Sequence, residues 1–291
     1  MQHDKTVGVI GLGLMGEVLC GRLMAAGFGV VGTDVDPAKN ARLGQRGGQA
    51  VASAAEVASC GVIALAVFST DQVEEVVETL LPLVAPGTVL LCTSTCDPDR
   101  IEALGKRLAG GHLRFLETPV SGTSEQVRQG DGVGLIGGDP AAAADVVAVL
   151  DALFPRRFHI GKIGDGGRAK LAVNLILGLN RMALAEGLTF AERMGLNPKA
   201  FLAVAKGAAS YSQVMETKGG KMLARDFAPE GRVKQTLKDV HMMLDQGERL
   251  GQSLPMLQVH CDVLESCVRA GEAERDNSIV VEEIRRRRKP V

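Results

Sequence analysis

The stretch that decides the fold is Val7–Gly16, which reads VGVIGLGLMG. A short apolar run leads directly into three glycines, and a helical pattern follows. The first glycine permits a tight turn, the second lets a pyrophosphate approach the backbone, and the third lets helix and strand pack closely. A phosphate at the amino end of that helix meets free amides and the positive end of the helix dipole. Gly11-Leu12-Gly13-Leu14-Met15-Gly16 therefore predicts a dinucleotide-binding turn, with a purely structural turn as the alternative.

Further short apolar runs alternate with helical patterns through the first half of the chain. Runs of this kind are typical of strands covered on both faces, as in a mainly parallel, doubly wound sheet. The expected strands are Val7–Ile10, Gly29–Thr33, Val62–Phe68, Thr88–Cys92, Leu113–Leu116 and Val133–Ile136. The expected helices between them are Met15–Ala26, Pro37–Arg46, Gln72–Val84, Pro98–Ala109 and Pro140–Leu153.

After about Gly161 the strand-like runs nearly vanish and long helical patterns take over. The expected helices are Gly167–Met194, Pro198–Ala205, Ser212–Ala224, Val233–Leu250 and Pro255–Ala270. A chain of 291 residues is long enough for two domains. We therefore predict an α/β protein with a Rossmann-type doubly wound parallel sheet in residues 1–163, followed by an all-α domain in residues 164–291.

The charge, the apolar runs and the cysteines of the chain indicate what kind of molecule it binds. The formal net charge is −1, which gives no general attraction to nucleic acid or to an anionic membrane. The longest apolar run, near Val62–Phe68, is too short to span a bilayer. The six cysteines follow no disulfide or zinc pattern, as expected of reduced thiols. These features predict a soluble cytoplasmic protein that binds a small molecule, without nucleic acid, membrane or metal.

Asp34 indicates which dinucleotide is bound. It lies at the end of the second expected strand, where an acidic residue hydrogen-bonds the adenosine ribose. A carboxylate there repels a 2′-phosphate, and the next residue is Val35 instead of an arginine. The pattern favours NAD over NADP. Either Asp34 or Asp36 could instead cap the helix that opens at Pro37, and we assign that cap to Asp36.

Lys170 and Asn174 suggest a catalytic site. They are four residues apart on the long helix that follows the glycine-rich segment 164–167, so they share one helix face. The amino end of a helix disfavours an ammonium group, which would help a lysine to exchange a proton near neutral pH. The alternative is a solvated lysine beside a capping asparagine.

The chain resembles the β-hydroxyacid dehydrogenase family over essentially its whole length. The resemblance is carried by the glycine turn, by Thr118-Pro119-Val120-Ser121-Gly122, by Gly164, Gly166, Lys170 and Asn174, and by Lys238-Asp239-Val240. It implies oxidation of the hydroxyl of a β-hydroxy acid, or the reverse reduction. It also implies a homodimer or homotetramer that acts on a small carboxylic acid.

The resemblance also implies roles for individual residues. Lys170 would be the general acid/base and Asn174 would position the substrate. Ser121 and Gly122, with Thr123 beside them, would bind the substrate carboxylate. Thr95, in the run that follows the strand ending at Cys92, would lie near the nicotinamide, and Lys238 near the cofactor.

Departures from the family pattern bear on the substrate. The family usually has a second glycine where this chain has Thr123, and a polar stretch continues to Arg128. This stretch predicts a substrate richer in hydroxyl groups, such as a sugar acid. The family's other asparagine is replaced by Val173, and Val240 replaces a leucine. The alternatives are an imine reductase, a decarboxylating relative of 6-phosphogluconate dehydrogenase, and a non-catalytic NAD(P)-binding module on the same fold. Lys170 argues against the first and the third, and the short expected second domain argues against the larger 6-phosphogluconate dehydrogenase relative.

Three further features of the sequence each have an interpretation that requires no role in catalysis. The basic run 285–289 is expected to be a disordered, solvated tail. His241 has no metal-ligand spacing in the sequence around it and is expected to be a structural polar residue. Tyr211, the only tyrosine, either contacts substrate or packs in the core.

Overall fold

The computed structural model describes residues 5–287. The chain divides into two compact units, unit 1 up to Lys170 and unit 2 from Leu171 onward. Within residues 5–287, unit 1 holds all the strands and unit 2 is built from helices. The predicted order, an α/β unit followed by a helical one, is confirmed.

Unit 1 is organised around a nine-stranded sheet. Its strands are β1 Thr6–Ile10, β2 Gly29–Thr33, β3 Gln49–Ala50, β4 Val62–Leu65, β5 Val89–Cys92, β6 Arg114–Glu117, β7 Val120–Ser121, β8 Val133–Gly137 and β9 Arg156–Gly161. The strand order is β3-β2-β1-β4-β5-β6-β8-β7, and β9 pairs with β8. Among the strand pairs of this sheet that the structure describes, only β6–β8 and β7–β8 are antiparallel. The chain order reverses between β1 and β4, and the carboxyl ends of strands at such a point are where ligands bind.

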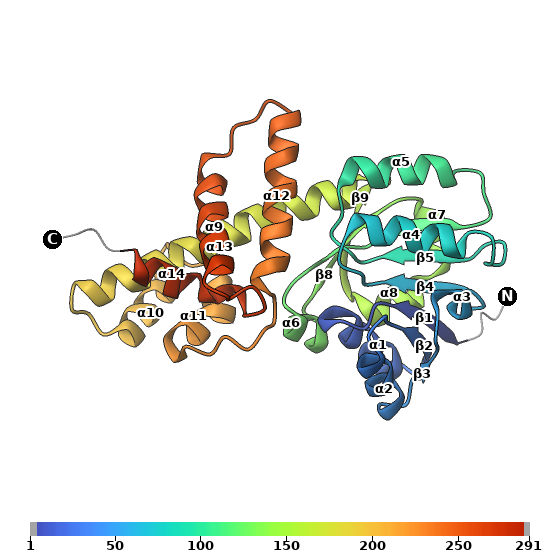
Figure 1. Ribbon diagram of the computed structural model, residues 1–291, viewed down its shortest axis with the longest axis horizontal. Coiled ribbons are helices and arrows are strands. Elements are labelled where there is room, and N and C mark those ends of the chain that lie inside the picture. Colours follow the sequence, from blue (N-terminus) through green and yellow to red (C-terminus); the bar gives the residue numbers. More distant parts are fainter. Residues whose placement is uncertain (1–4, 288–291) are drawn as a thin grey trace. The chain divides into compact units, whose positions relative to one another are not determined.

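Helices cover both faces of this sheet (Figure 1). They are α1 Leu14–Ala25, α2 Pro37–Gln45, α3 Ala54–Val57, α4 Thr70–Leu80, α5 Pro98–Leu108, α6 Ser124–Gln129, α7 Pro140–Asp145 and α8 Val147–Leu153. Successive residues of β4 point to opposite faces of the sheet. Ala64 packs in the core with α1 and α8, whereas Ile63 packs in the core with α4 and α5. This two-sided burial explains why the central strands are continuously apolar.

The sequence analysis did not expect the short elements β3, α3, β7 and α6 of unit 1, and two further differences have a clear cause. The helix expected over Pro140–Leu153 is broken into α7 and α8 at Val146, which is buried and has φ −112° and ψ 20°. Strand β9 was not expected because its polar and apolar residues follow no strand pattern and most of them are exposed. It pairs with β8 alone, so no packing demands an apolar pattern.

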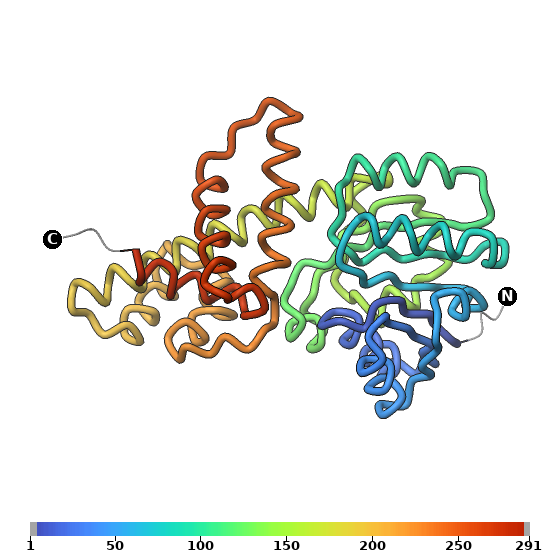
Figure 2. The backbone as a smooth tube through the Cα atoms, in the orientation of Figure 1, coloured from blue at the N-terminus to red at the C-terminus, as the bar shows by residue number. Residues whose placement is uncertain are grey.

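Unit 2 is helical throughout the described residues. Its elements are α9 Asp165–Arg193, which begins in unit 1, then α10 Pro198–Gly207, α11 Val214–Ala224, α12 Val233–Arg249, α13 Pro255–Arg269, the 3-10 helix η1 Asn277–Ile279 and α14 Val280–Arg286. The tube in Figure 2 shows α12 and α13 as an antiparallel pair joined by a short connection.

Helix α9, with 29 residues, is long and apolar enough by composition to cross a membrane. The core helix of a soluble protein passes the same test, which is therefore weak evidence. Leu171, Leu184 and Leu188 of this helix pack in the main hydrophobic cluster of unit 2. The apolar character of α9 is thus partly explained by burial against the other helices of that unit.

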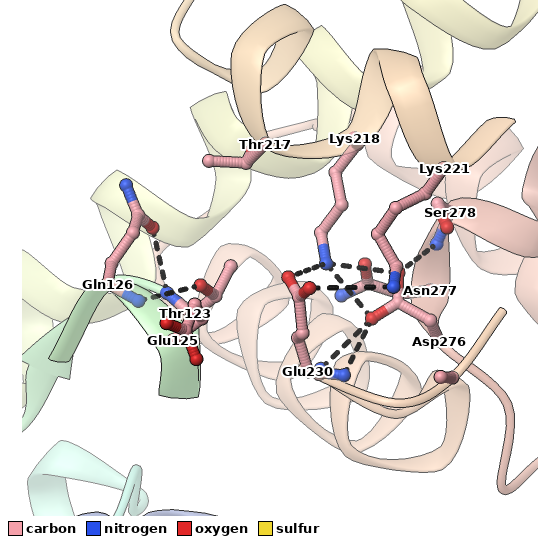
Figure 3. Close-up of polar contacts among 12 residues, drawn as sticks. Thr123, Glu125, Gln126, Thr217, Lys218, Lys221, Glu230, Asp276, Asn277 and Ser278 are labelled. Carbon is pink, nitrogen blue, oxygen red and sulfur yellow. Dashed lines mark hydrogen bonds and ion pairs between the residues drawn. The ribbon is translucent and has the colours of Figure 1, made fainter. Parts of the chain in front are cut away.

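A buried ion pair ties α11 to the segment before α14 (Figure 3). Lys218 Nζ lies 2.9 Å from Asp276 Oδ2, and both residues are nearly inaccessible. The same carboxylate accepts hydrogen bonds from the backbone amides of Glu230, at 2.9 Å, and Ser278, at 3.0 Å. Burial alone would raise the pKa of Asp276, but Lys218 and these amides lower it below its usual value.

The basic run 285–289 is not a disordered tail where the structure describes it. Arg285 and Arg286 form the last turn of α14. Arg285 donates to Glu192, with Nε 3.0 Å from Oε2, and Arg286 donates to Glu272, with Nη1 2.8 Å from Oε1. The expectation of a solvated tail is therefore wrong for residues 285–287, because acidic partners hold them: Glu192 and Glu272 for Arg285 and Arg286, and Glu283 of α14 itself for Arg287. Residues 288 and 289 lie outside the described part.

Candidate active site

The three glycines of the first turn have three different environments. Gly11 has φ +93°, and a Cβ there would lie 2.6 Å from the carbonyl oxygen of Ala66. A Cβ on Gly16 would lie 1.8 Å from the carbonyl oxygen of Gly11. At Gly13, which caps α1, a Cβ would meet nothing within 4 Å. The first and third glycines are thus required by the fold, while the second borders open space at the amino end of a helix.

Asp34 lies directly beside this turn. Its Oδ2 accepts a hydrogen bond from the amide of Leu12 at 2.7 Å, and its Oδ1 accepts one from the amide of Asp36 at 2.9 Å. Lys39 Nζ donates to both carboxylate oxygens, at 2.9 and 3.0 Å. Burial opposes ionisation, yet Lys39 and the two amides hold the pKa of Asp34 below its usual value. Asp34 is therefore a charged, oriented carboxylate at the end of β2.

Asp36 caps the following helix, as predicted. Its side chain accepts a hydrogen bond from the amide of Ala38 at 3.0 Å, and Pro37 occupies the first helical position. The two acidic residues thus have separate tasks. The surroundings of Asp34 are more basic than the sequence analysis recognised, because Lys39, Arg42 and Arg46 line a small pocket together with Leu12.

The segment after β5 is fastened to the neighbouring strand. Thr93 Oγ1 donates to the carbonyl of Leu65 at 2.6 Å, and Ser94 Oγ donates to the carbonyl of Val67 at 2.8 Å. Thr95 follows at once and is half-buried. The carboxyl end of β5 is therefore held to that of β4, and Thr95 lies at the edge of the sheet where this class of fold binds ligands.

The segment after β7 folds into a capped helix (Figure 3). Thr123 is the N-cap of α6: its Oγ1 accepts from the amide of Gln126 at 3.2 Å, and its own amide donates to Gln126 Oε1 at 2.9 Å. Just before it, Gly122 has φ +141°. Half-buried Ser121 pairs with Val133 of β8. The hydroxyl and amide of Thr123 are thus used by the capping box.

A buried carboxylate that the sequence analysis missed anchors the start of α9. Glu117, at the end of β6, accepts hydrogen bonds from the amide of Gly164 and, at 3.1 Å, from that of Gly167. A Cβ on Gly166 would lie 2.8 Å from the carbonyl oxygen of Leu135, so this helix start fits closely against the sheet. Burial raises the pKa of Glu117 to about 7 despite its amide donors. The available signal was its place immediately before Thr118 in the substrate-loop motif.

Lys170 follows this anchored start by one turn of helix. It is buried, with 6% of its surface exposed. Asn174 is one further turn along α9 and is half-buried. Because α9 is one continuous helix, the two side chains share a face, as the spacing requires.

In unit 2, the amide of Asn174 is fixed by α12. Asn174 Nδ2 donates to Asp239 Oδ2 at 3.0 Å. Lys238 Nζ lies 3.2 Å from the other oxygen of the same carboxylate. Asp239 is buried, and its two carboxylate oxygens contact two of the predicted site residues, Asn174 and Lys238. Such a contact orients the Asn174 side chain, which would otherwise rotate freely.

The chain matches two family models in succession. Residues 6–161 match the NAD binding domain of 6-phosphogluconate dehydrogenase. Residues 164–284 match the NAD-binding domain of NADP-dependent 3-hydroxyisobutyrate dehydrogenase. The fold and the glycine turn therefore define an oxidoreductase that uses a nicotinamide cofactor.

Individual relatives narrow the class. The chain is 30% identical to the L-threonate dehydrogenase of Cupriavidus necator over 283 residues, 96% of this chain and 95% of that protein. It is 27% identical to the 2-(hydroxymethyl)glutarate dehydrogenase of Eubacterium barkeri, over 97% of this chain and 95% of that protein. The crystal structure of a 3-hydroxyisobutyrate dehydrogenase from Salmonella typhimurium superposes with a TM-score of 0.87 at 28% identity, covering 95% of this chain and 99% of that one. The chain belongs to the β-hydroxyacid dehydrogenase family, oxidoreductases that act on the CH–OH group of β-hydroxy acids.

Proposed function

We propose that this protein oxidises a polar β-hydroxy acid of the sugar-acid type with NAD, or reduces the corresponding carbonyl compound. The observation that carries the proposal is Lys170, buried on α9 one turn before an asparagine whose amide is fixed by Asp239. A buried amine beside an oriented amide suits proton transfer to and from a bound hydroxyl group.

The proposed chemistry divides the work between cofactor and protein. A nicotinamide held at the glycine turn supplies the hydride chemistry. In oxidation, the neutral amine of Lys170 accepts the proton of the substrate hydroxyl, and in reduction its ammonium form returns that proton to the developing alkoxide. Asn174 positions the hydroxyl. Ser121 and the backbone of Gly122 hold the substrate carboxylate. Holding the substrate in the reactive orientation contributes much of the rate enhancement.

NAD is the proposed cofactor because Asp34 is an ionised carboxylate at the end of β2. Its charge repels a 2′-phosphate and its oxygens accept hydrogen bonds from ribose hydroxyls. Lys39, Arg42 and Arg46 line one pocket together with Glu17, which forms an ion pair with Arg46, and these three basic side chains make NADP the second candidate. Thr95 and Lys238 are proposed to lie near the nicotinamide, on the family resemblance alone.

The proposed substrate class is supported by the similarity to L-threonate dehydrogenase. The polar segment after Gly122 supports it less than its composition suggests, because its side chains pair with one another. Gln126 serves the cap on Thr123, Arg128 forms an ion pair with Glu125, and Gln129 donates to Glu125 at 2.8 Å. A role for Thr123 in substrate binding remains our proposal, and any such contact would have to coexist with its capping bonds.

The test is NADH formation from NAD with L-threonate, D-glycerate and 3-hydroxyisobutyrate, for the wild type and for Lys170→Ala. We expect turnover of the hydroxyl-rich acids and a loss of kcat of about 10²- to 10⁴-fold in the variant, the usual contribution of a general acid/base. Lys199→Ala, which removes an exposed lysine of α10, is the matched control. Tight NADH binding without turnover in either direction would instead support a non-catalytic module or an imine reductase.

We also propose a cytoplasmic homodimer or homotetramer assembled through unit 2. Large apolar side chains are exposed on α9, α10 and α13 and directly after α9: Ile176, Phe190, Val204, Met256 and Val259 on the helices, and Met194 after α9. Covering them would remove apolar surface from water. Sedimentation equilibrium of the wild type and of Phe190→Glu tests this, and a wild type that remains monomeric at high concentration would contradict it.

A further inference from the structure

A histidine, a cysteine and a glutamate meet on the surface of the α12–α13 pair. His241 belongs to α12, whereas Cys261 and Glu265 are one turn apart on α13. His241 Nε2 lies 3.6 Å from Glu265 Oε1, and Cys261 Sγ lies 3.8 Å from the same oxygen. The ligand atoms of all three side chains are within 4.8 Å of one another.

Two of these distances are close to what a tetrahedral metal ion requires, and the third, between His241 and Cys261, is within 4.8 Å. With metal–sulfur bonds of about 2.3 Å and metal–nitrogen and metal–oxygen bonds of about 2.1 Å, two ligands of one tetrahedral ion are separated by about 3.4 Å for nitrogen and oxygen and about 3.6 Å for sulfur and oxygen. The two separations from Glu265, 3.6 and 3.8 Å, each exceed these values by only a few tenths of an ångström. Small rotations about side-chain bonds can therefore bring the three atoms onto one ion.

We propose that His241, Cys261 and Glu265 bind a divalent transition-metal ion of the Zn²⁺ class and thereby cross-link α12 to α13. Thiolate and imidazole ligands select Zn²⁺ over Mg²⁺ and Ca²⁺, which prefer sets of oxygen atoms. Three protein ligands leave a fourth tetrahedral position for water or another small ligand.

The surroundings are compatible with entry of the ion. His241 and Glu265 have 51% and 41% of their side chains exposed, while Cys261 is buried next to them. An arriving ion can thus meet the imidazole and the carboxylate before the thiol. Arg269 Nη1 lies 3.7 Å from Oε2 of Glu265, so it contacts the oxygen that does not face the histidine and the cysteine.

Binding requires that the thiol lose its proton. The S–H bond of Cys261 breaks, a sulfur–metal bond forms and the proton passes to water, with no change in oxidation state. Thiolate sulfur binds Zn²⁺ strongly and Mg²⁺ weakly, so we expect no response to Mg²⁺.

None of the three residues is assigned to the dehydrogenase reaction, so this site stands apart from the proposed function. The sequence did not reveal it because His241 is on a different helix, 20 positions before Cys261. Only the packing of α12 against α13 brings the donors together. An ion that bridges both helices binds the folded chain better than the unfolded one, so it raises the melting temperature.

The test uses the full chain, freed of bound metal by dialysis against a chelator. Co²⁺ is titrated in first, because a thiolate ligand gives an intense near-ultraviolet charge-transfer band, and Zn²⁺ is then added in competition. The variants are His241→Ala, Cys261→Ser and Glu265→Gln. The controls are His112→Ala, Cys267→Ser and Glu248→Gln, which remove another exposed histidine, another buried thiol of α13 and an exposed glutamate of the neighbouring helix α12.

We expect one Co²⁺ equivalent per chain with the thiolate band, displaced by Zn²⁺ and not by Mg²⁺. Changes in the outer shell of a metal site already cost 10- to 100-fold in affinity, so loss of a ligand should weaken binding by at least about tenfold. The band should disappear altogether in Cys261→Ser. Zn²⁺ should raise the melting temperature of the wild type but not that of His241→Ala, Cys261→Ser or Glu265→Gln. Absence of the band in the wild type, or equal binding by the three variants and their controls, would overturn the proposal. Circular dichroism of each variant separates loss of the site from loss of the fold.

Discussion

Lys39 Nζ lies within 3.0 Å of both carboxylate oxygens of Asp34, at the end of the second strand. The carboxylate also receives two backbone amides, so it is oriented before any ligand arrives. A ribose that binds there must share or replace the contact with Lys39. The pair Asp34–Lys39 is therefore where the choice between NAD and NADP is made in our proposal.

Replacing Asp34 should reverse that choice. Asp34→Ala removes the charged acceptor of the ribose hydroxyls, and hydrogen bonds to charged groups contribute about 1.5–3 kcal/mol, equivalent to about 10- to 100-fold in affinity. We expect KM for NAD to rise by this factor while KM for NADP falls, because Lys39, Arg42 and Arg46 remain. Steady-state kinetics with both cofactors measure it, with Asp36→Ala as the neighbouring control. Equal changes for NAD and NADP would contradict the assignment.

The second and third glycines of the turn should respond differently to alanine. Gly13→Ala puts a methyl group into open space, so it should change the free energy of unfolding by no more than about 1 kcal/mol while weakening dinucleotide binding by about tenfold or more. Gly16→Ala brings a methyl group onto the carbonyl oxygen of Gly11 and should destabilise the fold by about 3 kcal/mol or more.

Urea unfolding and NADH fluorescence titration separate the two effects. Gly21→Ala is the control within α1, because nothing lies within 4 Å of its Cβ position. It should stabilise the protein by about 0.5–1 kcal/mol. If Gly13→Ala bound NADH as tightly as the wild type, the pyrophosphate would not lie where the turn predicts.

Glu117 should make stability depend on pH. Its pKa rises from 4.5 to about 7 on folding, so its contribution is fully present below pH 4.5 and is lost as the pH rises through 7. At 1.36 kcal/mol per pKa unit, the loss is about 3 kcal/mol. Glu117→Gln, which cannot ionise, should therefore gain about that much stability relative to the wild type between pH 5 and pH 8.

Comparing the wild type with Glu117→Gln separates the titration of Glu117 from that of the other ionisable groups. His260, whose pKa is lowered to about 3 by burial, acts in the opposite direction, and its contribution is lost as the pH falls below 6.5. That effect is common to the wild type and the variant. Parallel curves of stability against pH for the two proteins would show that Glu117 does not titrate in this range.

The buried pair Lys218–Asp276 should be costly to break. Asp276→Asn leaves a buried ammonium without its main partner, and removing one member of a buried ion pair costs about 3–5 kcal/mol. The double variant Lys218→Met/Asp276→Asn should lose less than the sum of the two single variants. Arg107→Ala, which removes an ion pair between exposed side chains, should cost less than about 1 kcal/mol. Chemical unfolding measures all four proteins, and strict additivity would mean that the two residues do not interact.

Local rules of sequence explain much of unit 1. The apolar runs predicted β1, β2, β4, β5, β6 and β8 to within a few residues, because strands covered on both faces must be apolar throughout. The capping role of Asp36 was also predictable, since aspartate is a preferred N-cap residue and proline a preferred first residue of a helix. The exposed strand β9 and the break at Val146 were not, because neighbouring elements impose both.

By itself the sequence determined the order of an α/β unit and a helical unit, the glycine turn, and the spacing of Lys170 and Asn174, because each depends on residues close together in the chain. Only the tertiary structure decided that Asp239 orients Asn174, that Glu117 anchors α9, and that His241 meets Cys261 and Glu265. These contacts join residues 20 to 65 positions apart. The packing of strands and helices sets such distances, and no local pattern of residue types records them.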